Sequence, residues 1–572
     1  MTDARPASSA EWIALGEYHL AAGRAAEAAA CYDRAVRLEP HAWASWAKLG
    51  KLQLATRQFD AAEAALSRAC SLQPNVAELH TGRAYALREQ NQVDTAVAAC
   101  LQALAIDPGN LHASIAEALM IPPVYADGGE LQAWRDRFAA GLDRLEARVS
   151  AWFADPRRIL DLEWSNFLLA YQGEDDVELQ RRYSRFVGGL LNRAAPRLQS
   201  SIVRERSEDG RVRVGFVSAD FRRSTVGDYF LHWITDLPRD RFHVTTFYTG
   251  HLVDDRTTAI VDASDSFVQL TGTPDHVAEA VRATPLDIAV LPDVGMSAKS
   301  VLLANLRLAP VQCAAWGHPV TTGSAFVDYF VSCDAMEPAD AQSHYSERLL
   351  RLPGIGARYR APDCTDASNR AHFGVPDDRH VYLCPQSLCK IHPDNDALFF
   401  DIVDRDENAM IALFAGQAKG QTQAIARRLE HGLRRRGVLP RRQFMFLPRM
   451  GRDRFLRFMQ LSEVMIDTRH WSGGNTTLDA LSVSLPVVTL EGRFMRGRQT
   501  AAMLRILGVE ELIASSSEQY VTLAVRIARD GEFREALRSR IRAASPKLFD
   551  RDEPIAALAE ILERLVGRRP AD

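Results

Sequence analysis

The chain of 572 residues has little lysine, no clustered cysteines, no strong net charge and no long apolar run. Its formal net charge of -4 gives no bulk attraction to nucleic acid, so a nucleic-acid partner is not expected. No run of about 18 apolar residues occurs, and the first residues show no apolar segment behind basic ones. We therefore expect a cytoplasmic protein without a membrane partner.

The eight cysteines lie scattered in apolar segments and show no CxxC spacing. A disulfide framework or a cysteine-based zinc site is therefore not expected. We also predict no cofactor. Positive charge comes almost wholly from arginine, because lysine occurs only at Lys48, Lys51, Lys299, Lys390, Lys419 and Lys547. A lysine inside a motif of this chain is therefore more informative than usual.

A pattern of 34 residues occurs three times at the start of the chain. The first copy carries Trp12, Leu15, Gly16, Ala28, Tyr32, Ala35 and Pro40. The second carries Trp46, Leu49, Gly50, Ala62, Leu66, Ala69 and Pro74, and the third Ala84, Ala96, Cys100, Ala103 and Pro108. This period is typical of the tetratricopeptide repeat, so residues 1–110 are predicted to form three helical hairpins. Stacked hairpins leave a concave surface suited to an extended protein or peptide partner; the alternative is that they only cap the next domain.

Residues 111–205 lose the period but keep helical patterns, and we interpret them as a helical bridge. After them, short β-rich runs alternate with helical segments, first in residues 206–365 and again in residues 366–572. Such alternation predicts parallel sheets covered by helices, here in two lobes. Because ligands in such sheets bind at the carboxyl ends of strands, the site is expected between the two lobes.

The stretch "VMIDTRHWSGGNTTLDAL" places Gly474, Asn475, Thr476 and Thr477 between a strand and a helix. A helix start offers unpaired N–H groups and a partial positive charge, and glycine lets a ligand approach the backbone. The residues suit a diphosphate, with Asp479 placed to accept from ribose hydroxyls. The alternative is that Asn475 and Thr476 only cap the helix.

Two further strand ends carry polar groups. In "CPQSLCKIHPDND", Lys390 could offset charge on a nucleotide leaving group, or could be a surface lysine. In "WGHPVTTG", His318 is a possible contact for a sugar, or an ordinary loop histidine.

Taken together, "RVGFVSADF", "LAPVQCAAWGHPVTTG", "HYSERLLRLP", "QSLCKIHPD" and "GGNTTLDAL" resemble the protein O-GlcNAc transferases and the SPINDLY proteins. The resemblance covers nearly the whole chain. It implies an α/α tetratricopeptide superhelix followed by an α/β GT-B glycosyltransferase region with two Rossmann-like lobes. It also implies an inverting, metal-independent transfer of a sugar, GlcNAc from UDP-GlcNAc, to Ser or Thr of a protein.

By the same resemblance, Lys390 looks like the pyrophosphate lysine and Asp479 like the ribose acid. Gly474, Asn475, Thr476 and Thr477 look like the diphosphate-binding helix start, and Gln386, Ser387 and Arg452 like further donor contacts. Candidates for acid–base work, left unranked, are Asp220, Asp228, Asp293 and His318.

Two positions depart from the family pattern. Ser224 stands where many members carry a histidine, and a hydroxyl cannot act as a base near pH 7. Phe455 falls where a histidine contacts uracil. Two alternatives therefore stay open: a transferase that uses another donor, such as a fucose or nonulosonic acid nucleotide, or a silent scaffold that keeps the sugar-nucleotide cleft.

Overall fold

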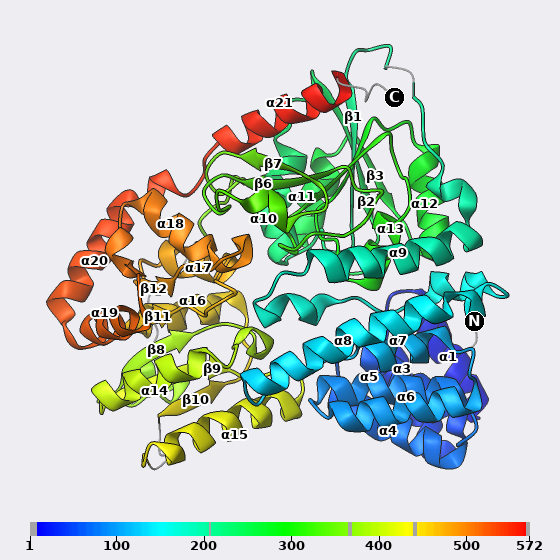
Figure 1. Ribbon diagram of the computed structural model, residues 1–572, viewed down its shortest axis with the longest axis horizontal. Helices are drawn as coiled ribbons and strands as arrows, with labels where there is room; N and C mark the ends of the chain where they lie inside the picture. Colours follow the sequence, from blue (N-terminus) through cyan, green and yellow to red (C-terminus); the bar gives the residue numbers. More distant parts are fainter. Residues whose placement is uncertain (1–7, 205–206, 364–368, 439–442, 568–572) are drawn as a thin grey trace. The chain divides into compact units, whose positions relative to one another are not determined.

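The computed structural model (Figure 1) describes residues 8–204, 207–363, 369–438 and 443–567. The predicted domain boundaries at 205/206 and 365/366 lie outside these ranges. The chain divides into two units, one of residues 1–154 with 415–427 and the other of residues 155–414 with 428–572. Within the described ranges, no helix has the length and apolar character needed to cross a membrane.

The first unit opens with three helical hairpins, as the repeat pattern predicted. They pair α1 (Ser9–Ala21) with α2 (Ala25–Leu38), α3 (Trp43–Ala55) with α4 (Phe59–Leu72), and α5 (Ala77–Glu89) with α6 (Val93–Ile106). A Cβ atom on Gly16 would lie 2.5 Å from the ring of Tyr32, and one on Gly50 would lie 2.6 Å from Leu66. The small and large positions of the pattern therefore interlock inside each hairpin.

The turns of the hairpins repeat as closely as the helices do. Gly23, Arg57 and Asn91 stand 34 positions apart and all have left-handed backbone, with φ of 74°, 59° and 61°. The prolines keep their register as well. The indole of Trp46 donates to the carbonyl of Pro40 at 3.0 Å, and His80 contacts that of Pro74 at 2.8 Å. One local geometry is thus copied along the array.

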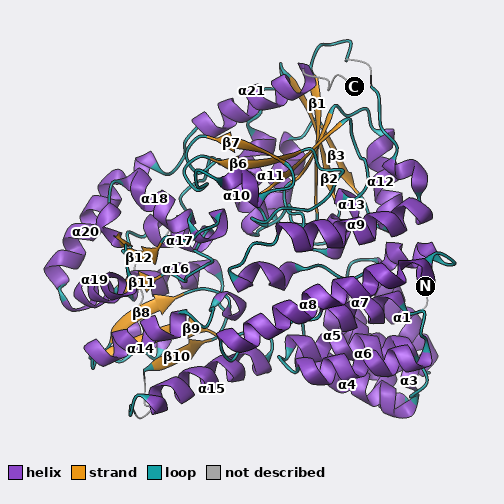
Figure 2. Ribbon diagram, viewed as in Figure 1, coloured by secondary structure: helices purple, strands orange, loops and turns teal. Residues whose placement is uncertain are grey.

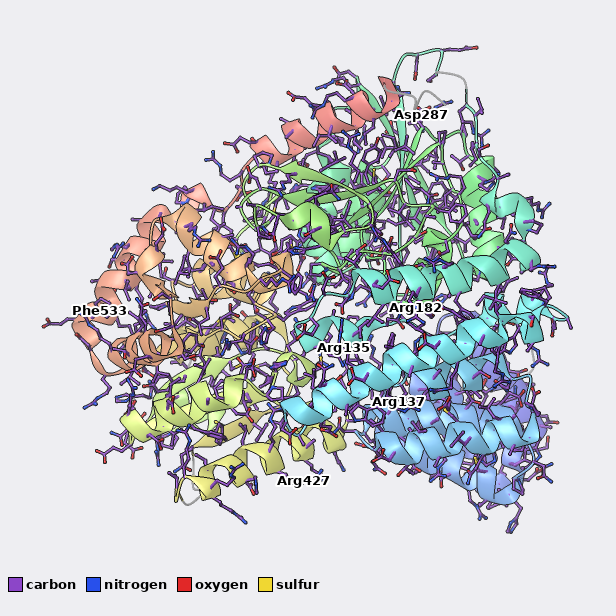
Figure 3. The ribbon with its side chains drawn as sticks, in the orientation of Figure 1. Arg135, Arg137, Arg182, Asp287, Arg427 and Phe533 are labelled. Carbon is purple, nitrogen blue, oxygen red and sulfur yellow. The ribbon has the colours of Figure 1, made fainter. Side chains whose placement is uncertain are left out.

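The array continues into α7 (Leu111–Leu119) and α8 (Gly128–Arg148). Arg137, labelled on α8 in Figure 3, joins these helices by donating to the carboxylate of Glu117 at 2.9 Å. Residues 415–427, far away in sequence, also belong to this unit. Gln421, on α15 (Lys419–Arg435), donates to the carbonyl of Glu89 at 2.9 Å, so the third hairpin is partly covered by this segment.

The second unit holds two parallel sheets. Figure 2 shows the strands of both sheets in orange. The first sheet has the strand order β3-β2-β1-β4-β5-β6-β7. Its strands are β1 (Val212–Ser218), β2 (Phe242–Tyr248), β3 (Ser266–Gln269), β4 (Ile288–Leu291), β5 (Val311–Ala315), β6 (Tyr329–Cys333) and β7 (Arg348–Leu352). Its helices are α9 (Val177–Ala194), α10 (Thr225–Thr235), α11 (Asp255–Ala263), α12 (Pro274–Ala283) and α13 (Ala298–Ala304).

The second sheet has the order β10-β9-β8-β11-β12-β13. Its strands are β8 (His380–Cys384), β9 (Ala409–Phe414), β10 (Phe444–Leu447), β11 (Val464–Ile466), β12 (Val487–Leu490) and β13 (Ile513–Ala514). Its helices include α14 (Asn395–Arg405), α16 (Arg452–Leu461), α17 (Asn475–Ser482), α18 (Gln499–Leu507), α19 (Ser517–Arg529) and α20 (Gly531–Ala544). The last helix, α21 (Glu553–Gly567), returns to the first lobe, where Glu563 pairs with Arg241.

The six strands of the second sheet have the same order as the first six strands of the first sheet, which adds β7 at its edge. In each, the first strand lies in the middle and the order reverses beside it, between β1 and β4 and between β8 and β11. Such a reversal opens a crevice at the carboxyl ends of the two strands, where ligands of α/β proteins bind. The predicted two-lobed α/β architecture is confirmed.

Candidate active site

The predicted site residues lie at the two strand reversals. Asp220 and Asp293 follow β1 and β4 in the first lobe, whereas Gln386 and the Gly473–Gly474 turn follow β8 and β11 in the second. The fold therefore places residues from four distant parts of the sequence at corresponding positions of two sheets.

The turn before α17 has no side-chain cap. The N-cap residue is Gly474, and no side chain in the described chain caps its helix start, so Asn475 and Thr476 do not serve as caps. Gly473 instead donates its N–H to the buried carboxylate of Asp467 at 2.9 Å. A Cβ atom on Gly473 would lie 2.7 Å from Oγ1 of Thr476, so the position has no room for a side chain. The N–H groups of the helix start therefore have no side-chain cap, which is the arrangement that an anion site uses.

Gln386 completes one side of this turn. Its Nε2 donates to Oγ1 of Thr476 at 3.4 Å, and the side chain is buried. Among the residues described, Oε1 of Gln386 and Oδ1 of Asn475 are buried without a hydrogen-bond partner. Unsatisfied buried oxygens are rare and costly, and a ligand that donates hydrogen bonds would satisfy them.

Thr476 and Thr477 differ in their surroundings. The Thr477 side chain is fully buried, and its hydroxyl bonds that of Thr500 at 2.8 Å. Thr476 is only half-buried and lies beside Gln386. Of the two predicted donors, Thr476 is therefore the one available to a ligand.

Lys390 ends a short 3-10 helix, Leu388–Lys390, after β8. Its Nζ lies 5.3 Å from the centre of the Trp471 ring, a cation–π contact. Burial lowers the pKa of Lys390, and the nearby Cys389 and Asp467 oppose that change. Ser387, by contrast, is exposed.

Arg452, the first residue of α16, joins the two lobes. Its guanidinium lies 2.6 Å from the carboxylate of Asp479 and 3.2 Å from that of Asp228, and it donates to the hydroxyl of Tyr359 at 2.9 Å. Burial raises the pKa of Asp479, and the charge of Arg452 opposes the rise. The acid predicted to hold ribose is thus paired with Arg452, so a ribose must compete for it.

Asp293 is the most perturbed acid of the first lobe. It is 2% exposed, and its Oδ2 accepts a hydrogen bond from Ser218 at 2.6 Å. Burial, with a smaller effect from the charge of Asp220, raises the pKa of Asp293 to about 7. Its other oxygen is buried without a partner in the described part of the chain. A carboxyl group with this pKa can both accept and release a proton near neutral pH.

Asp220 and Ser224 have structural partners. The Asp220 carboxylate accepts from Arg222 at 2.8 Å. Ser224 caps α10, because its Oγ accepts from the N–H of Gly227 at 3.1 Å and donates to the carbonyl of Asp220 at 2.8 Å. Ser224 therefore fixes the loop that carries Asp220.

His318 is buried where the lobes meet. Its ring stacks on Phe167 at 5.2 Å and lies 5.9 Å from the ring of Trp471. Burial, followed by the charges of Arg496 and Lys390, lowers the pKa of His318 to about 3. The imidazole is therefore neutral near pH 7 and too weak a base to take a proton, although its Nε2 could still contact a ligand.

Asp467 and Trp471 were not predicted from the sequence. Asp467 anchors Gly473 and accepts from Thr489 at 2.8 Å, and burial raises its pKa to about 6. Trp471 contacts Lys390 from one lobe and His318 from the other. An acidic residue directly after an apolar strand was the available signal for Asp467. The contacts of Trp471 depend on the tertiary fold.

A separate cavity of about 850 Å³ lies between α9 and the segments around Asn305 and Gly323. Its described lining contains no predicted site residue, and its arginines, Arg181 and Arg185, are exposed. The strand reversals are the better candidate, because buried polar groups and perturbed acids gather there.

The models of two known families match this chain. The model of glycosyl transferase family 41 matches residues 197–356 and 355–555, and that of the tetratricopeptide repeat matches residues 13–75 and 47–110. The chain is 25% identical over 397 residues to a probable UDP-N-acetylglucosamine–peptide N-acetylglucosaminyltransferase, SEC, of Arabidopsis thaliana, with 65% of this chain and 39% of that protein covered.

Two other proteins extend the comparison. A UDP-glucose:protein N-beta-glucosyltransferase of Actinobacillus pleuropneumoniae is 27% identical over 257 residues, which cover 44% of this chain and 40% of that protein. The chain thus spans about two fifths of the length of these curated relatives. A solved structure of a mutant O-GlcNAc transferase from Thermobaculum terrenum has a TM-score of 0.73 and 24% identity, covering 99% of this chain and 98% of that one, which supports the same fold. The predicted resemblance is confirmed.

Proposed function

The chain belongs to glycosyl transferase family 41, and from this we propose that it transfers a sugar from a nucleoside diphosphate to Ser or Thr of a protein. We propose UDP-GlcNAc as the donor, with no cofactor and no metal in the reaction. The tetratricopeptide hairpins are proposed to bind the protein acceptor.

One observation carries this proposal: the uncapped helix start at Gly474, with the unsatisfied oxygens of Gln386 and Asn475 around it. The free N–H groups and the Thr476 hydroxyl suit the negative oxygens of a diphosphate. The two unsatisfied oxygens suit donors such as sugar or ribose hydroxyls. A nucleoside diphosphate sugar carries both kinds of group.

In the proposed reaction, the acceptor hydroxyl oxygen forms a bond to the anomeric carbon of the sugar. The bond from that carbon to the diphosphate breaks, and the nucleoside diphosphate leaves with the electron pair. We assign removal of the hydroxyl proton to Asp293, whose pKa of about 7 suits a general base better than the value of about 3 at His318. Lys390 and the start of α17 would stabilise the charge on the leaving group.

The names of the relatives favour two donors for the test, UDP-GlcNAc and UDP-glucose. The experiment measures hydrolysis and transfer across UDP-, GDP- and CMP-sugars, together with calorimetric binding of UDP, GDP and CMP. We expect UDP to bind most tightly and UDP-GlcNAc to be used fastest. Fastest use of a GDP- or CMP-sugar would indicate a fucose or nonulosonic acid donor. Binding of UDP without turnover of any donor would favour the second candidate, a scaffold without transferase activity. Ser224 favours this candidate, because a hydroxyl there cannot act as the base that a histidine would supply.

A further inference from the structure

A cluster of three potential metal ligands lies outside the predicted site residues. It consists of His392 and Asp394, after β8, and His470, after β11. One nitrogen of each histidine and one oxygen of Asp394 lie within 4.8 Å of one another. Nε2 of His470 is hydrogen-bonded to Oδ2 of Asp394 at 2.7 Å. Nδ1 of His392 is 3.5 Å from the same oxygen and accepts the backbone N–H of Asp394 at 3.1 Å, so an ion bound through Nδ1 would replace that hydrogen bond.

These separations suit a tetrahedral zinc ion. Bonds of about 2.0–2.2 Å from zinc to nitrogen or oxygen place tetrahedral ligands about 3.3–3.6 Å apart. The 3.5 Å separation at His392 fits this range, whereas the 2.7 Å separation at His470 is a hydrogen bond that would lengthen when the ion enters. Two imidazoles with one carboxylate favour zinc over magnesium, which prefers oxygen ligands alone. Three protein ligands also leave a fourth position for water, and the Asp394 side chain is 44% exposed, so an ion can reach it.

The fold holds His470 in an unusual conformation. Its φ is 67°, in the left-handed region, which is unfavourable for a residue other than glycine. Its ring lies against Gly173, where an added Cβ would be 2.7 Å from Cγ of His470. Strained backbone of this kind persists where the surroundings fix it, and it is common at ligand sites. The imidazole is therefore held toward Asp394 by both its own backbone and its neighbour.

We propose that His392, Asp394 and His470 bind a zinc-class divalent cation. The ion would connect the loop that carries Lys390 to the loop that carries Trp471, two residues that already contact each other at 5.3 Å. It has no step in the proposed sugar transfer. Its expected effect is to stabilise the two loops that border the diphosphate site.

The test is calorimetric titration of the full chain with Zn²⁺ alone, in a buffer that does not bind metal. We expect one saturable site per chain. His470→Asn and Asp394→Asn should each weaken Zn²⁺ binding at least roughly tenfold, because even groups that only orient a ligand are worth roughly 10–100-fold in affinity. His243→Asn, which removes a half-buried histidine from β2, is the matched control and should bind as the wild type does.

Thermal unfolding and UDP binding without zinc confirm that each variant is folded. Absence of a saturable Zn²⁺ site in the wild type would overturn the proposal, as would unchanged affinity in both ligand variants. Zinc should also raise the Tm of the wild type but not that of His470→Asn. Loss of the zinc site with intact UDP binding would leave the proposed transferase function standing, and zinc binding without UDP binding would count against that function only.

Discussion

The two lobes have the same order of strands around the reversal but present opposite chemistry there. In the first lobe, the strand ends carry Asp293, with its raised pKa, and His318, which burial keeps neutral. In the second, they carry an uncapped helix start and Lys390. The first lobe thus offers groups that accept protons or hydrogen bonds, and the second offers donors and positive charge.

This difference indicates a division of labour. A parallel sheet fixes where its strand ends meet but not which side chains stand there, so one topology can serve proton transfer in one lobe and anion binding in the other. Variants of the first lobe should therefore reduce transfer while leaving nucleotide binding intact. Variants of the second lobe should change nucleotide binding as well. Arg452 is the exception, because it bridges Asp228 of one lobe and Asp479 of the other.

The largest effect is expected for Asp293→Asn, which keeps the shape of the side chain but cannot accept a proton. Loss of a general base should lower the transfer rate roughly 10²–10⁴-fold, with UDP affinity unchanged by calorimetry. Asp240→Asn, at an exposed aspartate of the same lobe, is the matched control and should leave the transfer rate unchanged. Equal losses in the two variants would remove Asp293 from its assigned role.

The pH profile tests the same assignment. Only the ionised Asp293 can act as a base, and its pKa is about 7, so the transfer rate should rise as the pH increases through 7 and level off above it. The residual activity of Asp293→Asn should lack this inflection. An inflection near pH 7 that persists in the variant would assign the base to another group.

Lys390→Ala should have the next largest effect. Removing one electrostatic contact to a leaving group typically costs roughly 10²–10³-fold in rate, and UDP should also bind more weakly. Lys547→Ala, at an exposed lysine, is the control and should leave both quantities unchanged. Wild-type turnover in Lys390→Ala would exclude this lysine from the mechanism.

The binding of UDP and of uridine to the wild-type protein tests the phosphate site without a mutation. If the start of α17 binds a diphosphate, UDP should bind at least about tenfold more tightly than uridine, which lacks the charged oxygens. EDTA should not abolish UDP binding, because the helix start and Lys390 would supply the positive charge. Equal affinities for uridine and UDP, measured by calorimetry, would mean that the turn binds no phosphate.

Much of this organisation could be predicted from the sequence. Local patterns predicted the hairpins, the two α/β lobes and the turn at Gly474, because each depends on residues within one short segment. Contacts between distant segments could not be predicted in the same way. Residues 415–427 pack on the hairpins, and Arg452 occupies the carboxylate of Asp479. The cluster of His392 and His470 joins two loops that are far apart in the sequence.

The smallest effect separates two adjacent threonines that the sequence could not distinguish. Thr476 is half-buried beside Gln386, so Thr476→Val should remove one hydrogen bond to the diphosphate and weaken UDP binding by about 0.5–1.5 kcal/mol. Thr477 is fully buried and bonded to Thr500, so Thr477→Val should instead lower the free energy of unfolding by about 1 kcal/mol, with little change in affinity. Calorimetry and urea unfolding of the same two variants measure both quantities. The reverse result, with affinity lost in Thr477→Val and stability lost in Thr476→Val, would mean that the ligand approaches the helix start from the other side.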